Sequence, residues 1–304
     1  MDTVAWPDRF WGLLPRVLRQ PLQILFKAVS RWSEDRGPQL GAAIAFYTMF
    51  AVAPLLVVAI AIAGAVFGED AARGQIVGEI EGLVGQAAAK SIEAMIESAW
   101  RHPNGLWASL LGVVTLLVGA TGVFAELRRA LNAIAHVVPG PSSALSTFVR
   151  ARLIGFALVL GFGFLAIVSL LLSAVLAALG SYLAVRYPTL SELMGLVDVL
   201  VSTSVLVMAF AALLRWLPEH RPSRLAVWVG AVSSAVMFSV GKHLIGLYLV
   251  HASVASSYGA AGSFVVVMLW VYYSAQILLL GGALGAVVDE EYSPAAVAAR
   301  GLPV

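Results

Sequence analysis

Residues 263–288, SFVVVMLWVYYSAQILLLGGALGAVV, run for 26 positions without a charged side chain. A helix of about 20 apolar residues is long enough to cross a bilayer core of about 30 Å, so this stretch predicts a transmembrane helix. Five earlier stretches are similarly long and apolar, and they cover residues 40–67, 105–125, 153–185, 193–214 and 225–250. We therefore expect an all-α, polytopic membrane protein with about six transmembrane helices.

The composition favours the same class and excludes several others. Of the 304 residues, 60% are hydrophobic and 12% are charged, about half the charged fraction of a soluble domain. The chain has no cysteine, which excludes disulfides, cysteine-ligated metals and thiol catalysis. Its five histidines are scattered without carboxylates at metal-ligand spacing, and no phosphate-binding loop motif is present. We therefore expect no catalytic residue, no metal, no cofactor and no nucleic-acid partner, and we expect that the protein is not an enzyme.

The distribution of lysine and arginine predicts the orientation in the membrane. Fourteen of these residues lie in the two termini and in the second–third and fourth–fifth connections, and four lie in the opposite connections. Basic connections face the cytoplasm, so both termini should be cytoplasmic and the protein should lie in the cytoplasmic membrane. The expected organisation is an amphipathic N-terminal segment (1–38), a six-helix transmembrane domain (39–290) and a cytoplasmic tail (291–304).

Two segments outside the predicted spans have amphipathic helical patterns. Within residues 69–104, apolar side chains recur at helical spacing between Glu81, Lys90 and Glu93, which predicts a helix packed on the outer face. The segment 1–38 combines tryptophan, phenylalanine and leucine with six basic residues. Such a helix can rest on anionic lipid, so membrane lipids are expected partners. The alternative is a positive-inside anchor with no further role.

Ionisable groups inside the predicted spans are candidates for function, because burying one in a bilayer costs about 2.5–3.5 kcal/mol. Asp198 lies in the fourth span and Lys242 in the fifth, and counting residues from the outer ends puts both at a similar depth. We predict an Asp198–Lys242 ion pair, which His243 could extend into a polar cluster. The pair would either lock two helices together or line a path for substrate or protons. The other alternative is that Lys242 extends outward alone.

The other candidates are uncharged. Gln276 is the main polar residue of the sixth span and would hydrogen-bond a neighbouring helix. Gly281, Gly282 and Gly285 follow it and predict a close helix–helix contact, either within the fold or in a homodimer. Pro54 lacks an N–H and should kink the first span. Tyr47, one to two turns before it, would belong to the core or line a cavity.

Three stretches occur in a fixed order along the chain: LGAAIAFYTMFAVAPLL at residues 40–56, ELRRALNAI at residues 126–134 and SYGAAGSFVVVMLWVYYSAQILLLG at residues 257–281. Together they resemble the YihY/virulence factor BrkB family of bacterial inner-membrane proteins, once labelled ribonuclease BN. The resemblance implies six transmembrane helices with cytoplasmic termini and, for some members, a link to lipid or lipopolysaccharide export. This chain departs from the family pattern at Ala51, at Ala135 and, most importantly, at Ala283.

The departure at Ala283 concerns a charge. The family commonly has a glutamate at this position, so this member either lacks the associated activity or supplies the charge from Asp289 or Glu290. The leading hypothesis is transport or flipping of a lipid or another amphipathic envelope component. The alternative is a non-transporting scaffold that binds an envelope protein through residues 69–104.

Overall fold

The computed structural model describes residues 16–51, 122–137, 188–251 and 262–292, together with short stretches and single positions between 74 and 161. These residues are helical apart from short turns, and none of them forms a strand. The predicted all-α class is confirmed.

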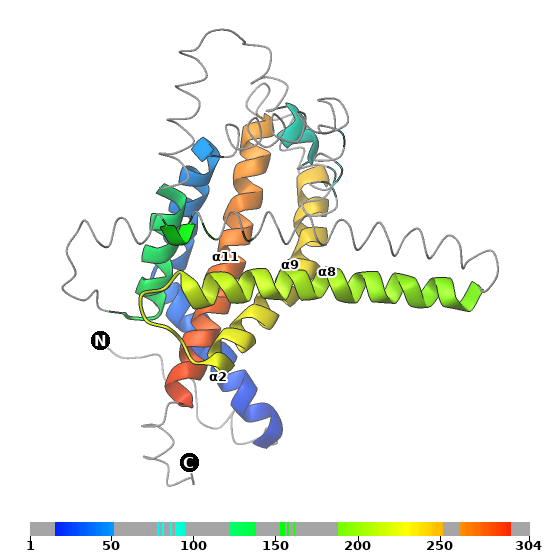
Figure 1. Ribbon diagram of the computed structural model, residues 1–304. Coiled ribbons are helices and arrows are strands. Elements are labelled where there is room, and N and C mark those ends of the chain that lie inside the picture. Colours follow the sequence, from blue (N-terminus) through cyan, green and yellow to red (C-terminus); the bar gives the residue numbers. More distant parts are fainter. Residues whose placement is uncertain are drawn as a thin grey trace.

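Four long helices and two shorter helical segments make up the described part of the fold. The long helices are α2 (Arg16–Glu34), α8 (Pro188–Trp216), α9 (Arg224–His251) and α11 (Gly262–Glu291). The shorter segments comprise residues 37–51 and 122–134. Figure 1 shows α11 at the centre, with α2 at its lower end and α9 beside it.

Three helical stretches are long and apolar enough to cross a membrane: Val199–Trp216, Arg224–Ile245 and Phe264–Glu291. They coincide with the predicted fourth, fifth and sixth spans, so a helical membrane protein is confirmed. Most residues of the first three predicted spans, including Pro54, lie outside the described residues. The count of six spans therefore stays a prediction.

The helices α9 and α11 pack through small residues that let the two backbones approach closely. A Cβ atom built on Gly281 would lie 1.9 Å from Ser234 Oγ and 2.8 Å from the Gly230 carbonyl oxygen. A Cβ atom on Gly285 would lie 2.9 Å from the Ala226 carbonyl oxygen. Small residues permit this approach, which is a common way for helices to associate in membranes. The predicted glycine face thus makes a contact within the fold.

The core lies where α11 meets the 122–134 helix and the adjoining parts of α8 and α9. Its fully buried side chains include Ile134 and Leu279. Ala283 is also fully buried in this core. The position at which the resemblance implies a glutamate is therefore occupied here by an apolar packing residue.

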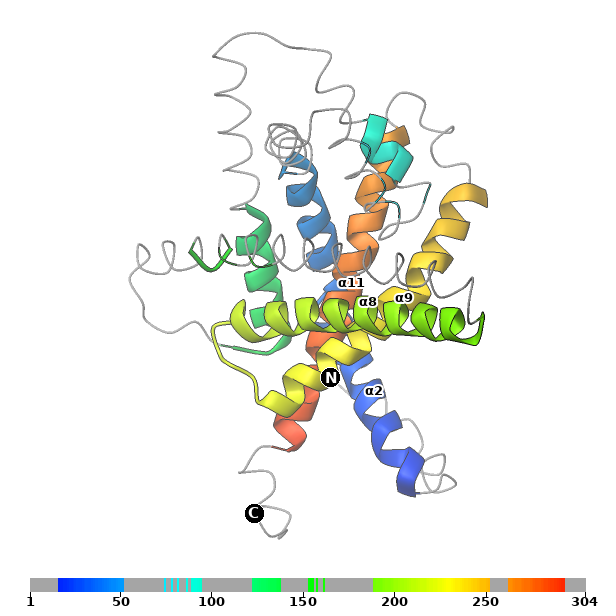
Figure 2. The same cartoon turned by 45° about the vertical axis from the view of Figure 1, so that its right-hand side comes forward.

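The helix α8 runs across α11 and not alongside it, in both Figure 1 and Figure 2. Its C-terminal half packs on α9, where the ring centroids of Phe210 and Phe238 are 6.1 Å apart. Near its other end Val199 and Leu200 are exposed. This arrangement differs from the antiparallel neighbours that the order of the spans suggested.

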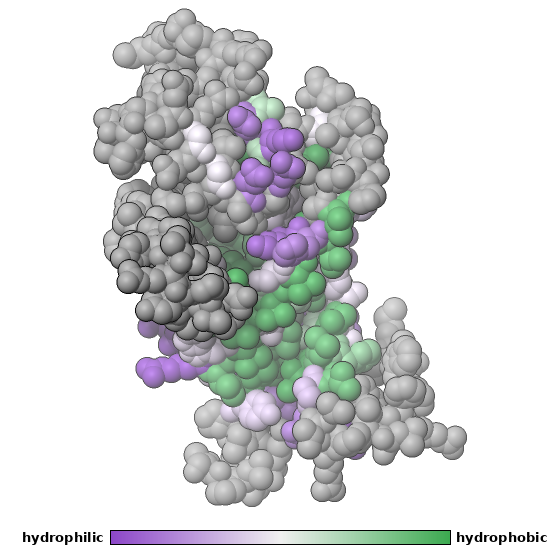
Figure 3. Space-filling view, turned by 90° about the vertical axis from the view of Figure 1, so that its right-hand side faces the viewer, coloured by the Kyte–Doolittle hydropathy of each residue, from purple (hydrophilic) through white to green (hydrophobic). Residues whose placement is uncertain are grey.

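The helix α9 keeps an apolar stripe on its outer side. The large side chains of this stripe recur every three or four residues and are 47–61% exposed: Leu225, Trp228, Val232, Val236, Val240, Leu244, Leu247 and Tyr248. Figure 3 shows apolar side chains gathered in a continuous patch over the middle of one face of the molecule. An exposed apolar surface of this extent marks contact with lipid or with another protein, which agrees with a membrane-spanning α9.

Candidate functional site

The 122–134 helix, which contains the ELRRALNAI motif, holds the turn between α8 and α9. The buried Asn132 side chain accepts a hydrogen bond through Oδ1 from the Glu219 N–H at 3.0 Å. Arg128 donates through Nη2 to the Glu219 carboxylate, also at 3.0 Å. These two contacts fix residues 217–223 against the motif helix.

The motif helix ends at residue 134 and is capped by His136, which has a left-handed φ of 51°. The Val137 N–H donates to the Asn132 carbonyl at 2.9 Å and the His136 N–H to the Ala133 carbonyl at 3.0 Å, which is the bond pattern of a Schellman C-cap. Glycine is the usual residue at this position. Here the histidine side chain adds a contact, because its Nε2 lies 3.0 Å from Asp35 Oδ2 in the turn after α2. The ring therefore connects two helix ends.

The start of α9 is held from α11. The Ser223 N–H donates to Asp289 Oδ1 at 3.0 Å, and Ser223 Oγ accepts the Ala226 N–H at 3.3 Å as an N-cap. The Arg215 guanidinium donates to the Pro222 carbonyl within the same turn. Asp289 thus joins the end of α11 to the beginning of α9.

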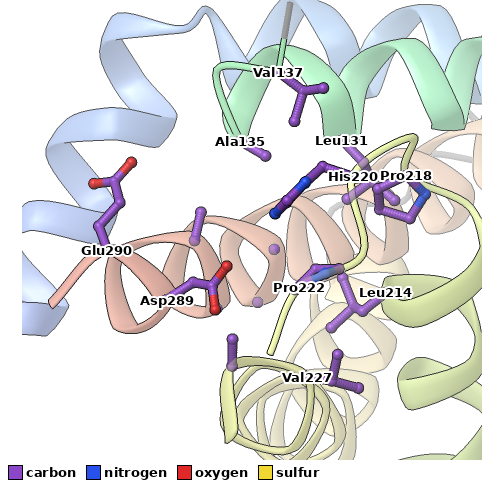
Figure 4. Close-up of a pocket in the computed structure, with 15 residues that line it drawn as sticks. Leu131, Ala135, Val137, Leu214, Pro218, His220, Pro222, Val227, Asp289 and Glu290 are labelled. Carbon is purple, nitrogen blue, oxygen red and sulfur yellow. The ribbon is translucent and has the colours of Figure 1, made fainter. Parts of the chain in front are cut away.

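A pocket of about 220 Å³ lies between the motif helix, the α8–α9 turn and the glycine-rich part of α11. Its walls are largely apolar and include Leu131, Leu214 and Val227. Figure 4 shows the His220 ring and the Asp289 carboxylate projecting into it from different elements. The pocket therefore combines an apolar interior with a titratable side chain from the turn and another from α11.

The acidic end of α11 is held by cations from α2. Arg31 Nη2 donates to both carboxylate oxygens of Glu290, at 2.8 and 2.7 Å, and Lys27 pairs with Glu291. In Figure 4 Glu290 points toward α2, away from His220. Asp289 is the remaining acid at this end, and its described hydrogen bond comes from the Ser223 backbone. Asp289 thus supplies the pocket with a carboxylate that has no ion-pair partner among the described residues.

Gln276 makes a hydrogen bond between helices, as its position in the sixth span suggested. Its side chain is buried, and Oε1 accepts from Trp32 Nε1 at 2.9 Å. Its Nε2 packs against Gly41, where a built Cβ atom would lie only 1.9 Å away. Gln276 therefore joins α11 to α2 and to the start of the 37–51 helix.

The predicted Asp198–Lys242 ion pair stays a prediction, because the Asp198 side chain lies outside the described residues. Lys242 is half-buried on α9 and has no ion-pair partner in the described part of the chain. His243 is exposed, and its Nδ1–H donates to the Ser239 carbonyl of its own helix at 2.9 Å. Asp198 and Lys242 would lie at equal depth only if α8 and α9 were antiparallel. The helix α8 instead runs crosswise, so equal depth no longer follows.

Tyr47 is 41% exposed and lies against the start of the motif helix. A Cβ atom built on Gly122 would lie 2.7 Å from Tyr47 Cδ1, and the Phe46 ring packs edge-on to Tyr47 with centroids 6.0 Å apart. Tyr47 does not line the pocket described here. Pro54, the other residue of the predicted kink, lies outside the described residues.

No motif in the sequence singles out His220. It lies in the stretch LPEHRPS at residues 217–223, where two prolines flank three titratable side chains between two spans. That pattern indicates a rigid, polar turn, and it is the one feature of the sequence that could have drawn attention to this residue. Asp289 was considered as a replacement charge for the family's glutamate, and the structure places it at the pocket.

The family model for virulence factor BrkB matches residues 28–301 of the chain. The chain belongs to the virulence factor BrkB family. It is 28% identical over 278 residues to a UPF0761 membrane protein of Ralstonia nicotianae. The matched region covers 89% of this chain and 61% of that relative. The BrkB-family chain thus spans about three fifths of the length of the Ralstonia protein.

Two other relatives match over most of their own length. The chain is 25% identical over 274 residues to the ribonuclease-like protein YfkH of Bacillus subtilis, covering 88% of this chain and 96% of that protein. It is 25% identical over 271 residues to a UPF0761 membrane protein of Haemophilus influenzae, covering 86% and 93%. No solved structure matches the chain.

Proposed function

We propose that this BrkB-family protein binds a lipid or another amphipathic envelope molecule in the pocket and moves it across the cytoplasmic membrane. The observation that supports this function is the combination of apolar walls with the His220 ring and the Asp289 carboxylate. An amphipathic ligand needs both kinds of surface, because its hydrocarbon part favours apolar contacts and its head group needs hydrogen-bond partners. The proposal gives the chain a transport role and no catalytic one.

The size of the pocket limits what it holds at one time. Its volume of about 220 Å³ is smaller than that of typical ligand sites, which measure about 300–1,000 Å³. It therefore suits a head group with the first part of a chain. The rest of a lipid would remain in the bilayer, beside the exposed apolar stripe of α9.

The charges around the pocket support a cytoplasmic position for it. The motif helix contributes Arg128 and Arg129, and the α8–α9 connection contributes Arg215, Arg221 and Arg224. Connections rich in arginine stay on the cytoplasmic side. With this orientation the ligand would enter from the inner leaflet and both termini would be cytoplasmic.

Lipid flipping by the purified protein in liposomes tests the proposal, with fluorescent phospholipids and dithionite quenching. Ala286 lines the pocket, so Ala286→Leu should fill part of it and reduce flipping. Ala133→Leu is the matched control, because Ala133 is exposed on the motif helix and the same addition meets solvent or lipid. Flipping by wild type and by Ala133→Leu, with loss in a folded Ala286→Leu variant, supports the proposal.

Two results would contradict the proposal. Wild-type protein without activity above empty liposomes would count against lipid flipping. Full activity in Ala286→Leu would show that the pocket is not part of the transport route. Folding of each variant is checked by its elution profile and thermal unfolding, so that loss of activity is not confused with loss of structure.

One observation favours the scaffold as a second candidate. Within the outer amphipathic segment, Ala89 and Ile92 are buried while Lys90 and Ala94 are exposed. This one-sided burial leaves the charged Lys90 on an exposed face that could meet an envelope protein. Affinity capture distinguishes the candidates, since a stoichiometric partner that is lost on deleting residues 69–104, together with an absence of flipping, would favour the scaffold.

A further inference from the structure

The helix α2 carries a stripe of apolar side chains that is not buried in the fold. The stripe consists of Leu22, Leu25, Phe26 and Val29, whose spacing of three, four and seven residues places them on one side of the helix. Their exposed fractions are 40–47%. Four large apolar residues at this spacing, in a helix that also has basic residues, are typical of a helix lying in a membrane interface.

Contacts with α11 fix the rotation of α2 about its own axis. Ala28 is 1% exposed and belongs to the core. Trp32 donates to Gln276 at 2.9 Å, and Arg31 pairs with Glu290 at 2.7 Å. Because these contacts hold the adjoining side of α2 against α11, the exposed stripe cannot turn into the core.

The position of α2 along the bundle places the stripe near the boundary of the membrane. Lys27 pairs with Glu291, the last residue of α11, and α11 is one of the candidate spans. Figures 1 and 2 show α2 leaving the lower end of α11 at a slant. The second half of α2 therefore lies beside the end of a membrane-spanning α11, at the level of the lipid head groups.

The charges of α2 favour an anionic partner. Residues 16–36 contain five arginine or lysine side chains and two acidic ones. Arg19 and Arg36 are exposed and have no ion-pair partner among the described residues. Such free cations beside an apolar stripe match the phosphate layer of an anionic leaflet more closely than they match the apolar surface of another protein.

We propose that α2 is a lipid-binding helix whose apolar stripe inserts at the boundary between head groups and acyl chains. Arg19 and Arg36 contact the phosphates of anionic phospholipids. This surface is separate from the pocket, and the inference does not depend on whether the protein transports anything.

The absence of cysteine allows a direct test with single nitroxide labels on the whole protein in nanodiscs. Leu25→Cys places the label on the stripe, and Gln20→Cys places it at an exposed position on the polar side of the same helix. Dissolved oxygen partitions into lipid and a nickel chelate stays in water. Oxygen should be the stronger relaxant at position 25 and the nickel chelate the stronger one at position 20.

The charge part of the proposal is tested by lipid composition. Depth at position 25 is compared in phosphatidylcholine nanodiscs with and without phosphatidylglycerol. The anionic lipid should move the label deeper, and Arg19→Gln should reduce this shift, whereas Arg221→Gln, an exposed arginine on another element, should leave it unchanged.

Three outcomes would overturn the proposal. A label at position 25 that the nickel chelate reaches more readily than oxygen would place the stripe in water. Exclusion of both reagents would show that protein covers the stripe, either residues 1–15 or a second copy of the chain. A label depth at position 25 that does not depend on phosphatidylglycerol would contradict the proposed contacts with anionic lipid.

Discussion

Replacing Gly281 with alanine should strain the contact between α9 and α11. The new Cβ atom would lie 1.9 Å from Ser234 Oγ and 2.8 Å from the Gly230 carbonyl oxygen, whereas ordinary contacts are 3.4–4 Å. Because one of these atoms belongs to the backbone, rotating the serine side chain cannot relieve the whole clash. Overpacking of this kind costs about 1–3 kcal/mol, and alanine in place of glycine in a helix returns about 1 kcal/mol. The free energy of unfolding should therefore fall by up to about 2 kcal/mol.

Gly161→Ala separates the packing cost from the gain in helix propensity. Gly161 is helical and exposed, and a Cβ atom built on it meets no other atom within 4 Å. This variant should show the propensity gain alone. The difference between Gly281→Ala and Gly161→Ala then gives the packing cost, about 1–3 kcal/mol. Reversible unfolding in mixed micelles, followed by circular dichroism, measures both free energies.

A double-mutant cycle with Ser234→Ala identifies the atoms responsible. Ser234 Oγ donates only a long hydrogen bond of 3.4 Å to the Ile277 carbonyl, so its removal alone should cost little. In the Gly281→Ala/Ser234→Ala variant the nearest clash is absent, and at least about 0.5 kcal/mol should be recovered. Equal stabilities of Gly281→Ala and Gly161→Ala, or no coupling with Ser234, would refute the close approach of α9 and α11 at these residues.

Two further predictions follow from the described contacts, and a third follows from the ion pair that the sequence predicts. Arg128→Gln should lower the free energy of unfolding by about 1.5–3 kcal/mol, because its carboxylate partner loses a charged hydrogen bond; the exposed Arg221→Gln should change it by less than about 0.5 kcal/mol. Gln276→Met should cost about 0.6–2 kcal/mol by breaking the hydrogen bond to its indole partner, and tryptophan fluorescence should shift with it. Asp198→Lys and Lys242→Asp should each stop flipping while the combined swap restores it; a swap that stays inactive in a folded protein would count against the pair.

The three candidate spans could be predicted because a bilayer permits few structures. A long apolar segment in lipid must satisfy its own backbone hydrogen bonds, so a run such as residues 263–288 has to be helical. The glycine face at Gly281 and Gly285 could be predicted as a close contact because small residues let two helix backbones approach each other in a membrane. The sequence of one helix does not identify its partner, so the choice of α9 and the part played by Ser234 required the structure.

The pocket could not be predicted, because it is built from three segments that are distant in the sequence. The motif helix provides Leu131, the α8–α9 turn provides His220 and the end of α11 provides Asp289. Reasoning from the cost of burying charge directs attention to ionisable residues within spans, such as Lys242. His220 and Asp289 lie just beyond the ends of the predicted spans, where a charge costs little, so the same reasoning gives them no weight.

The basic residues at this end of the molecule have two roles that the sequence pattern does not separate. Counted by position, Lys27, Arg31 and Arg128 orient the chain in the membrane. In the structure the same side chains pair with acidic residues: Lys27 and Arg31 hold the end of α11, and Arg128 holds the turn that carries His220. An arginine substitution here would therefore disturb orientation, packing and pocket shape together. A neutral change such as Ala286→Leu alters the pocket alone, and for this reason it gives the clearer test of transport.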